Sequence, residues 1–176
     1  MLVENLNGET LETLTIGDRV FYPAHGVAAV TGEEERDFGG IKQSFYVLEL
    51  ERGGSVMVPV GKVDRAGVRS LVNADQAREL MKLVMTDPQV EIKLDHASRK
   101  RRYALYAEAL KSGSALRYTE ILQELLFRLR TDKLSSSEQQ TLDTARSYFV
   151  GEVGVGLDLT ADQCDAELGL APSSSS

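Results

Sequence analysis

The stretch that decides the fold class of the first half of the chain is Gln43-Ser-Phe-Tyr-Val-Leu-Glu-Leu50, continued by Glu51-Arg-Gly-Gly54 and Ser55-Val-Met-Val-Pro-Val60. Aromatic and β-branched residues fill its first and last segments, which is typical of strands. The Arg-Gly-Gly sequence between them is typical of a tight hairpin. The stretch therefore predicts an antiparallel pair of strands over 43–50 and 55–60.

Two shorter strands are expected before this hairpin. Arg19–Tyr22 is ended by Pro23, and a second apolar run, Val27–Val30, follows the next turn. The acidic run Glu33–Glu35 comes after it, and we expect these charges to be solvated, before a turn at 37–40. Several short strands within about 50 residues predict a small, strongly bent sheet or barrel.

The spacing of apolar residues becomes helical after Leu71. Apolar positions recur at i, i+3, i+4 and i+7 over 75–85, 98–111 and 114–130. Capping-box patterns at Ser135–Glu138 and Thr160–Gln163 predict the starts of two more helices. The residues expected to face inward are Ala77, Leu80, Met81, Val84, Tyr103, Tyr106, Ala107, Leu110, Tyr118, Ile121, Leu122, Leu125, Leu129, Leu142, Ala145 and Phe149.

Strands and helices are segregated along the chain, which predicts an α+β fold or two separate domains. We expect a loose N-terminal arm over 1–14, a β module over 15–72, a helical domain over 73–170, and a serine-rich tail or linker over 171–176. The arm is expected to be loose because it consists of small polar residues with scattered acids.

The composition favours a cytoplasmic protein. Cys164 is the single cysteine, so no intramolecular disulfide can form, and we expect it to be a small buried residue of the last helix. No apolar run approaches the roughly 18 residues of a membrane span, and the first residues lack a secretory signal pattern. The net charge of −7 argues against broad nonspecific DNA binding, which depends on neutralising many phosphates.

Patterns for catalysis or metal binding do not occur in the sequence. His25, His96 and Cys164 are far apart, and none of the usual zinc-ligand spacings is present. Gly151-x-x-Gly154-x-Gly156 follows a predicted helix, so we interpret it as a flexible helix exit and not as a phosphate loop. We expect a binding protein that needs no cofactor or metal and is not an enzyme.

The strand at 55–60 is a candidate binding edge. It is almost continuously apolar yet contains Pro59, which lacks the N–H for a ladder hydrogen bond and belongs on an edge strand. An apolar edge is a hazard unless it is covered or meets a partner, and strand addition is one way to meet a partner. The alternative is that Pro59 simply ends a buried strand.

A second candidate is the run Arg99-Lys100-Arg101-Arg102, which forms a local basic patch on an acidic chain. Cations at the start of a helix oppose the helix dipole, which indicates another use for them. Phosphate contact is one use. The alternative is a solvated surface in which these cations pair with Glu108 or other acids.

Several short motifs occur in a fixed order between about residues 15 and 155. They are Gly17-Asp18-Arg19-Val20-Phe21-Tyr22-Pro23 with Gly26-Val27, Phe45–Leu48, Val56–Pro59 with Lys62-Val63, Gly67–Arg69, Arg101–Tyr103, Lys111–Gly113, Leu134-Ser135 with Glu138, and Leu142-x-x-Ala145-Arg146 with Gly151-Glu152. In this order they resemble the CarD/CdnL family of bacterial transcription regulators. The first module of that family also occurs in the transcription-repair coupling factor.

The resemblance implies a Tudor-like, SH3-like β barrel that binds the β subunit of bacterial RNA polymerase by adding its edge strand to a sheet of the polymerase. The residues that match this contact surface are Arg36, Phe38, Met57, Val58 and Pro59. It also implies a compact all-α bundle that touches promoter DNA at the upstream edge of the melted bubble. A protein of this kind is nucleoid-associated when it is bound to the polymerase.

The chain departs from the family at one position. Many members carry a tryptophan just before the Arg101–Tyr103 motif, whereas this chain has no tryptophan and places Arg99 there. Arginine cannot insert between base steps as an apolar side chain such as tryptophan does, but it can enter a narrow minor groove or bind a phosphate. Two partners therefore stay open for the helical domain. One is promoter DNA, contacted by Arg99, Lys100, Arg101 and Arg102, and the other is a second regulatory protein, which would make the chain an interaction hub.

Within the family, the chain resembles the N-terminal part of the myxobacterial CarD branch. That branch continues into an acidic stretch and a basic AT-hook tail. No AT-hook motif occurs in the 176 residues.

Overall fold

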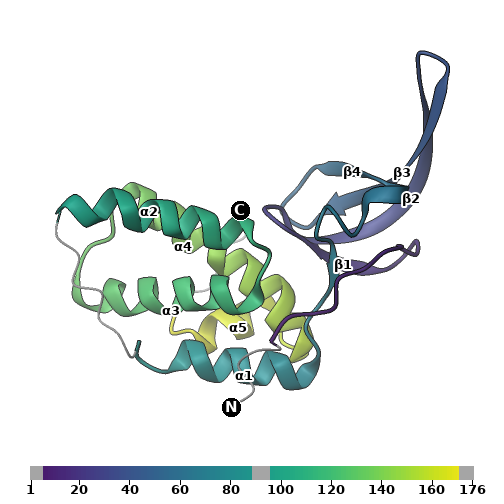
Figure 1. The fold of residues 1–176 in the computed structure, drawn as a ribbon. Helices are drawn as coiled ribbons and strands as arrows, with labels where there is room; N and C mark the ends of the chain where they lie inside the picture. The colour runs from purple at the N-terminus through teal and green to yellow at the C-terminus, as the bar shows by residue number, and fades with distance from the viewer. Residues whose placement is uncertain (1–5, 89–95, 171–176) are drawn as a thin grey trace. The chain divides into compact units, whose positions relative to one another are not determined.

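The computed structural model describes residues 6–88 and 96–170, which form two compact units (Figure 1). The β unit is Gly8–Leu71, and the helical unit consists of Met1–Asn7 together with Val72–Ser176. The chain therefore passes between the units twice, at 7–8 and at 71–72. Strands and helices are segregated in the two units, which confirms the expected α+β class.

The β unit is built on one antiparallel sheet with the strand order β4-β3-β2-β1-β5. A short 3₁₀ turn, η2 (Val60–Lys62), follows Pro59. Figure 1 shows β2 and β3 extending beyond the other strands as a long hairpin. The strands are β1 (Arg19–Tyr22), β2 (Gly26–Phe38), β3 (Ile41–Leu50), β4 (Ser55–Pro59) and β5 (Arg69–Ser70).

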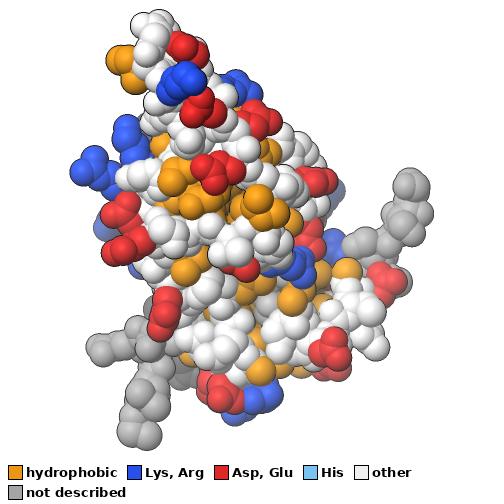
Figure 2. All heavy atoms as spheres, turned by 90° about the vertical axis from the view of Figure 1, so that its right-hand side faces the viewer, with side chains coloured by type: hydrophobic (Ala, Val, Ile, Leu, Met, Phe, Trp, Pro, Cys, Tyr) orange, Lys and Arg blue, Asp and Glu red, His pale blue; other side chains and the backbone are white. Residues whose placement is uncertain are grey.

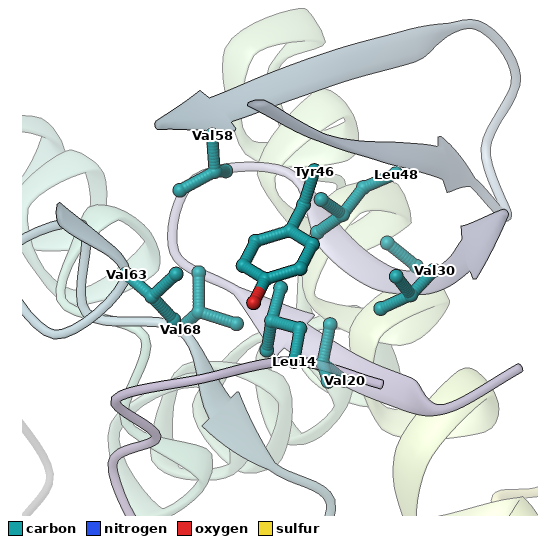
Figure 3. Close-up of a cluster of buried hydrophobic side chains, with 9 residues drawn as sticks. Leu14, Val20, Val30, Tyr46, Leu48, Val58, Val63 and Val68 are labelled. Atoms are coloured by element: carbon teal, nitrogen blue, oxygen red, sulfur yellow. The ribbon is translucent and has the colours of Figure 1, made fainter. Parts of the chain in front are cut away.

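One face of this sheet carries the core of the β unit. Alternate residues of neighbouring strands, among them Leu48 and Val58, point into a cluster that Tyr46 shares (Figure 3). Segments outside the strands complete the cluster with Leu14, Val63 and Val68. Burying each such aliphatic side chain contributes about 1.5–3 kcal/mol, so the cluster supplies the main stabilisation of the unit.

Strand β2 is longer than the predicted segment 27–30, because it continues through the acidic run to Phe38. Both faces of the hairpin are solvated at Glu33–Glu35, so charged side chains are tolerated there in a strand. The register skips one residue. Val30 pairs with Leu48 and Gly32 with Val47, which leaves Thr31 as a bulge whose Oγ1 donates to the Val47 carbonyl at 3.3 Å.

A loose arm was expected over 1–14, but the structure shows ordered contacts in its second half. Residues 1–5 lie outside the described residues. Leu14 is buried in the core cluster. Thr10 forms a β-bridge with Arg69, and the Leu11 amide donates to the Val68 carbonyl at 2.9 Å. Backbone pairing to β5 therefore orders a segment whose composition alone suggested flexibility.

In the described residues the helical unit contains five α-helices with side-chain caps at four starts. Asn73, Ser114, Ser135 and Thr160 each accept a hydrogen bond from a first-turn amide, which contributes about 1 kcal/mol per cap. The two predicted capping boxes, Ser135 with Glu138 and Thr160 with Gln163, are confirmed. The helices are α1 (Ala74–Met85), α2 (His96–Lys111), α3 (Ala115–Thr131), α4 (Ser136–Phe149) and α5 (Ala161–Glu167).

The predicted inward faces of α1, α3 and α4 are largely confirmed, with Leu129 exposed and Met81 half-buried as the exceptions. Helix α2 agrees only in part. Among its described side chains Arg102, Tyr106 and Ala109 are buried, so the prediction is confirmed for Tyr106; the predicted Tyr103 and Leu110 are half-buried, and the predicted Ala107 is exposed. The buried face of α2 differs from the predicted one because Arg102 points inward and binds the buried carboxylate of Glu138. No helix in the described part of the chain is long and apolar enough to cross a membrane.

The flexible helix exit predicted at 151–156 is wrong. Val150–Gly154 forms a π-helical segment, η3, in which Gly151 and Gly154 are buried. An added Cβ at Gly156 would lie 2.8 Å from the Ala77 Cβ, so the small residue permits close helix packing. Cys164 is fully buried beside Gly154, and this burial raises the pKa of its thiol to about 11. The prediction of a small core cysteine is confirmed.

Candidate binding surfaces

Strand β4 lies at one edge of the sheet. It pairs with β3 through Val47↔Met57, Tyr46↔Val58 and Phe45↔Pro59, and no strand of the described residues pairs with its other side. At the opposite edge, β5 is bridged by Thr10. Pro59 therefore lies on an edge strand, as predicted from its lack of an N–H group. The outer main chain of this strand is open to a partner.

The three residues Met57, Val58 and Pro59 do not share one face. Val58 is fully buried in the core cluster, so only its main chain can reach a partner. Met57 and Pro59 point to the opposite side and are half-buried. Residues paired across an antiparallel ladder share a face. We call this side the outer face, formed by Phe38, Ile41, Phe45, Val47, Met57 and Pro59.

The outer face continues to the tip of the β2–β3 hairpin. Phe38 pairs with Ile41 across the turn, and the two side chains are 56% and 73% exposed. The Phe38 ring packs edge-on against Phe45 with 6.0 Å between ring centroids, which links the tip to the sheet. Figure 2 shows hydrophobic side chains gathered on the β unit below the hairpin tip, with charged ones around them.

Ile41 was not singled out from the sequence. The signal that could have found it is its position directly after the Gly39-Gly40 turn, which makes it the cross-strand partner of Phe38.

Charged side chains are divided between the two faces of the hairpin. Arg36 lies on the outer face and pairs with Glu34 at 3.4 Å, and both are exposed. Glu33, Glu35 and Asp37 occupy the opposite face, as the alternation of the strand requires. Lys42 lies on that opposite face too and pairs with Glu35 at 3.2 Å. The outer face is thus mainly apolar, and most of the acidic side chains of the hairpin point away from it.

The basic run on α2 is divided as well. Arg99, Lys100 and Arg101 are exposed, whereas Arg102 is buried. Its Nη2 donates to Glu138 Oε1 at 2.8 Å. Arg102 therefore cannot belong to one surface patch with the other three cations, and the candidate patch is reduced to Arg99–Arg101.

Arg102 and Glu138 belong to a network that joins three helices. Arg128 Nη1 lies 3.2 Å from the same Glu138 oxygen, and the Ser135 amide donates to Oε2 at 2.9 Å. Burial alone would raise the pKa of Glu138. The hydrogen bonds from Ser135 and the charges of Arg128 and Arg102 outweigh burial and lower that pKa below its ordinary value. The ionised carboxylate is thus the reason why Arg102 faces inward.

The described residues contain no group of three or more His, Cys, Asp or Glu side chains arranged to hold a metal ion. The His25 ring stacks on Tyr22 with 4.8 Å between centroids, in the turn before β2. The His96 side chain lies outside the described residues.

Comparisons with known proteins match both units. Residues 14–72 match the model of the CarD-like/TRCF RID domain, and residues 83–169 match that of the CarD C-terminal domain. The chain is similar to a Bacillus subtilis protein named "Putative transcription factor YdeB", with 25% identity over 149 residues that cover 84% of this chain and 95% of the relative. It is also similar to the solution NMR structure of the 72-residue N-terminal domain of Myxococcus xanthus CarD. That similarity has 40% identity, a TM-score of 0.29, and coverage of 36% of this chain and 87% of the other.

Proposed function

Because the chain belongs to the CarD/CdnL family, whose members are transcription factors, we propose that it binds the β subunit of bacterial RNA polymerase through the β4 edge. A strand of the polymerase pairs with the open main chain of β4 and extends the sheet. The complex is cytoplasmic and becomes nucleoid-associated through the polymerase.

The open edge of β4 is the observation that supports this proposal. Main-chain hydrogen bonds supply affinity in strand addition, and alternate side chains supply specificity. Here the alternate side chains are Met57 and Pro59, which belong to the half-buried outer face. Phe38 and Arg36 lie on the same face of the neighbouring hairpin and extend the contact. Val58 contributes main-chain atoms and core packing.

The test is binding of the full chain to an isolated polymerase β lobe, measured by biolayer interferometry. The double variant Met57→Asp/Pro59→Asp places two charges on the outer face and should lose at least about tenfold in affinity, as expected for charges desolvated in an interface. Lys111→Asp, at an exposed position of the helical unit, changes the net charge by the same amount and should bind normally. Unchanged binding by a folded double variant would exclude this surface.

For the helical unit we propose contact with promoter DNA through Arg99, Lys100 and Arg101, which are exposed and consecutive. Phosphate contacts position a protein on DNA, and exposed guanidinium and ammonium groups can make them. The second candidate is a regulatory protein, favoured by the net charge of −7 and by an arginine at the tryptophan position of the family.

Titration of promoter DNA at two salt concentrations separates these partners. A measurable affinity with a steep salt dependence, reduced in Arg101→Ala, supports DNA contact. No detectable binding at low salt would exclude DNA and support a protein partner for this unit.

A further inference from the structure

Two neighbouring side chains of α2 bind the capping box that begins α4. Arg102 Nη2 donates to Glu138 Oε1 at 2.8 Å, and the Tyr103 hydroxyl forms a hydrogen bond of 3.0 Å with Ser135 Oγ. Ser135 and Glu138 also bind each other's main-chain amides, as the two ends of that capping box. The same two side chains therefore fix the start of α4 and hold α2 against it.

Aliphatic packing contributes little to the attachment of the first half of α2. Among the described side chains of this helix only Arg102, Tyr106 and Ala109 are buried, and Leu105 is exposed. Tyr106 makes a polar bond as well, because its hydroxyl donates to Glu124 Oε1 of α3 at 2.7 Å. The side-chain bonds of residues 102, 103 and 106 therefore hold this half of the helix on α3 and α4.

Glu138 is central to this attachment because two cations share it. Its Oε1 accepts from Arg102 and lies 3.2 Å from Arg128 Nη1, so both guanidinium groups approach one oxygen. Without the carboxylate charge, two cations would face each other in a largely buried site, which is unfavourable. Loss of that charge should therefore release Arg102 from its inward position and loosen the first half of α2.

The direction of Arg102 also decides the directions of the three cations before it. Consecutive residues of an α-helix are rotated by about 100° around the helix axis, since 3.6 residues make one turn. Arg99, Lys100 and Arg101 belong to the turn that leads into Arg102, and all three are exposed. As long as Arg102 points inward, the Cα–Cβ bonds of these three residues keep fixed directions relative to α3 and α4.

We propose that Glu138 is a positioning residue for the exposed cations Arg99, Lys100 and Arg101. It binds Arg102, and the bound Arg102 holds the first half of α2 in the orientation that presents these cations to phosphates. Glu138 is buried, so it acts through Arg102 and not by touching DNA. The inference rests on the DNA contact proposed for the helical unit and adds to it a residue outside the basic run.

Amide hydrogen exchange of the full chain, followed by NMR, tests the attachment without DNA. Glu138→Gln keeps the size of the side chain and removes its charge. The amides of residues 101–106 should then exchange at least about tenfold faster, because local opening of this half of α2 becomes easier. The amides of α1 are the internal reference and should be nearly unchanged, whereas a general loss of stability would accelerate exchange in both helices.

Promoter DNA binding by the same chains tests the consequence, because charge and positioning predict opposite signs. Glu138→Gln removes one negative charge, so by charge alone it should bind DNA at least as tightly as the native chain. Loss of positioning should instead weaken the affinity about threefold to tenfold, since cations that are no longer held must be ordered on binding. The matched control is Asp143→Asn, which makes the same charge change at an exposed position of α4 and should not weaken binding.

Tyr103→Phe provides a second test that keeps every charge. It removes the hydrogen bond to Ser135 and should give the same pattern with smaller effects, even if Glu138→Gln fails to fold. Unchanged α2 exchange in the folded variants, or DNA binding by Glu138→Gln as tight as that by Asp143→Asn, would overturn the positioning role. If the native chain binds no promoter DNA, the DNA proposal fails, and faster exchange confined to α2 still supports the role of Glu138 in holding the basic run.

Discussion

The β4 edge and the start of α2 present their candidate binding groups in different chemical forms. At β4 the groups are main-chain atoms, available because of the position of the strand in the sheet, with Met57 and Pro59 beside them. On α2 the groups are side chains of a basic run, and one of the four, Arg102, is directed inward. The exposed main chain of an edge strand is determined by the strand order of the sheet. The exposed side chains of a helix depend on which residues of that helix are buried by packing.

The largest expected effect is a difference in stability between alanine variants of the neighbours Arg102 and Arg101. Arg102→Ala leaves Glu138 buried with fewer partners, so the free energy of unfolding should fall by about 3–5 kcal/mol. Arg101→Ala, on the exposed face, should change it by less than about 0.5 kcal/mol. Urea unfolding followed by circular dichroism measures both. Equal stability losses for the two neighbours would contradict the buried position of Arg102.

A smaller contrast is expected between Val58 and Met57. Val58→Ala removes buried methyl groups from the core cluster and should cost about 2 kcal/mol of unfolding free energy. Met57→Ala, on the outer face, should cost less in stability but weaken binding to the β lobe. Denaturant unfolding and lobe binding are measured on both variants. The assignment of faces fails if Val58→Ala weakens the intrinsic binding of fully folded protein more than Met57→Ala does.

The Glu138 network should also make the helical unit sensitive to acid. The pKa of Glu138 is lowered in the folded chain, so its stabilising contribution is fully present above the ordinary value of 4.5. The contribution is lost as the pH falls through the folded-state pKa. Glu138→Gln should therefore show a shallower decrease of unfolding free energy below about pH 4.5 than the native chain. Identical slopes in acid titrations of thermal stability would exclude this role.

The smallest expected effect concerns the salt dependence of DNA binding. If Arg101 contacts one phosphate, Arg101→Ala should reduce the slope of log K against log salt by about 0.9. Arg99→Ala should behave alike, and their effects on affinity should be nearly independent of promoter sequence. Fluorescence anisotropy at several salt concentrations gives the slopes. A loss confined to one promoter sequence would indicate base contact instead of phosphate contact.

The sequence predicted elements whose signals are local. The Arg52–Gly54 hairpin, the edge position of Pro59 and the capping box of Ser135 depend on residues close together in the chain. The errors involve partners that are distant in sequence. Arg102 faces inward because of a carboxylate 36 residues later, and no pattern within α2 reveals that acceptor.

The same reason explains the two segments mistaken for flexible ones. Residues 9–11 pair with residues 68–70, about 60 residues away, as the bond between Glu9 and Ser70 shows. Leu14 is buried in the core cluster. Gly151 and Gly154 are buried. Gly154 lies against Cys164 and the half-buried Gly156 against Ala77, so these glycines are packing residues and not breaks. A composition rich in glycine and polar residues predicts flexibility for an isolated segment. In the folded chain, contacts with residues distant in the sequence hold these two segments in one conformation.

The bulge at Thr31 also has a consequence for how such proteins diversify. It shifts the phase of β2, so Arg36 and Phe38 share the outer face while Glu33, Glu35 and Asp37 occupy the other. If Thr31 instead took a regular place in the ladder, opposite Val47, the alternation would continue unbroken from Val30 and the two sets would exchange faces. Loss of the bulge with the strand kept at its length is therefore a route by which a descendant could change an apolar docking face into an acidic one.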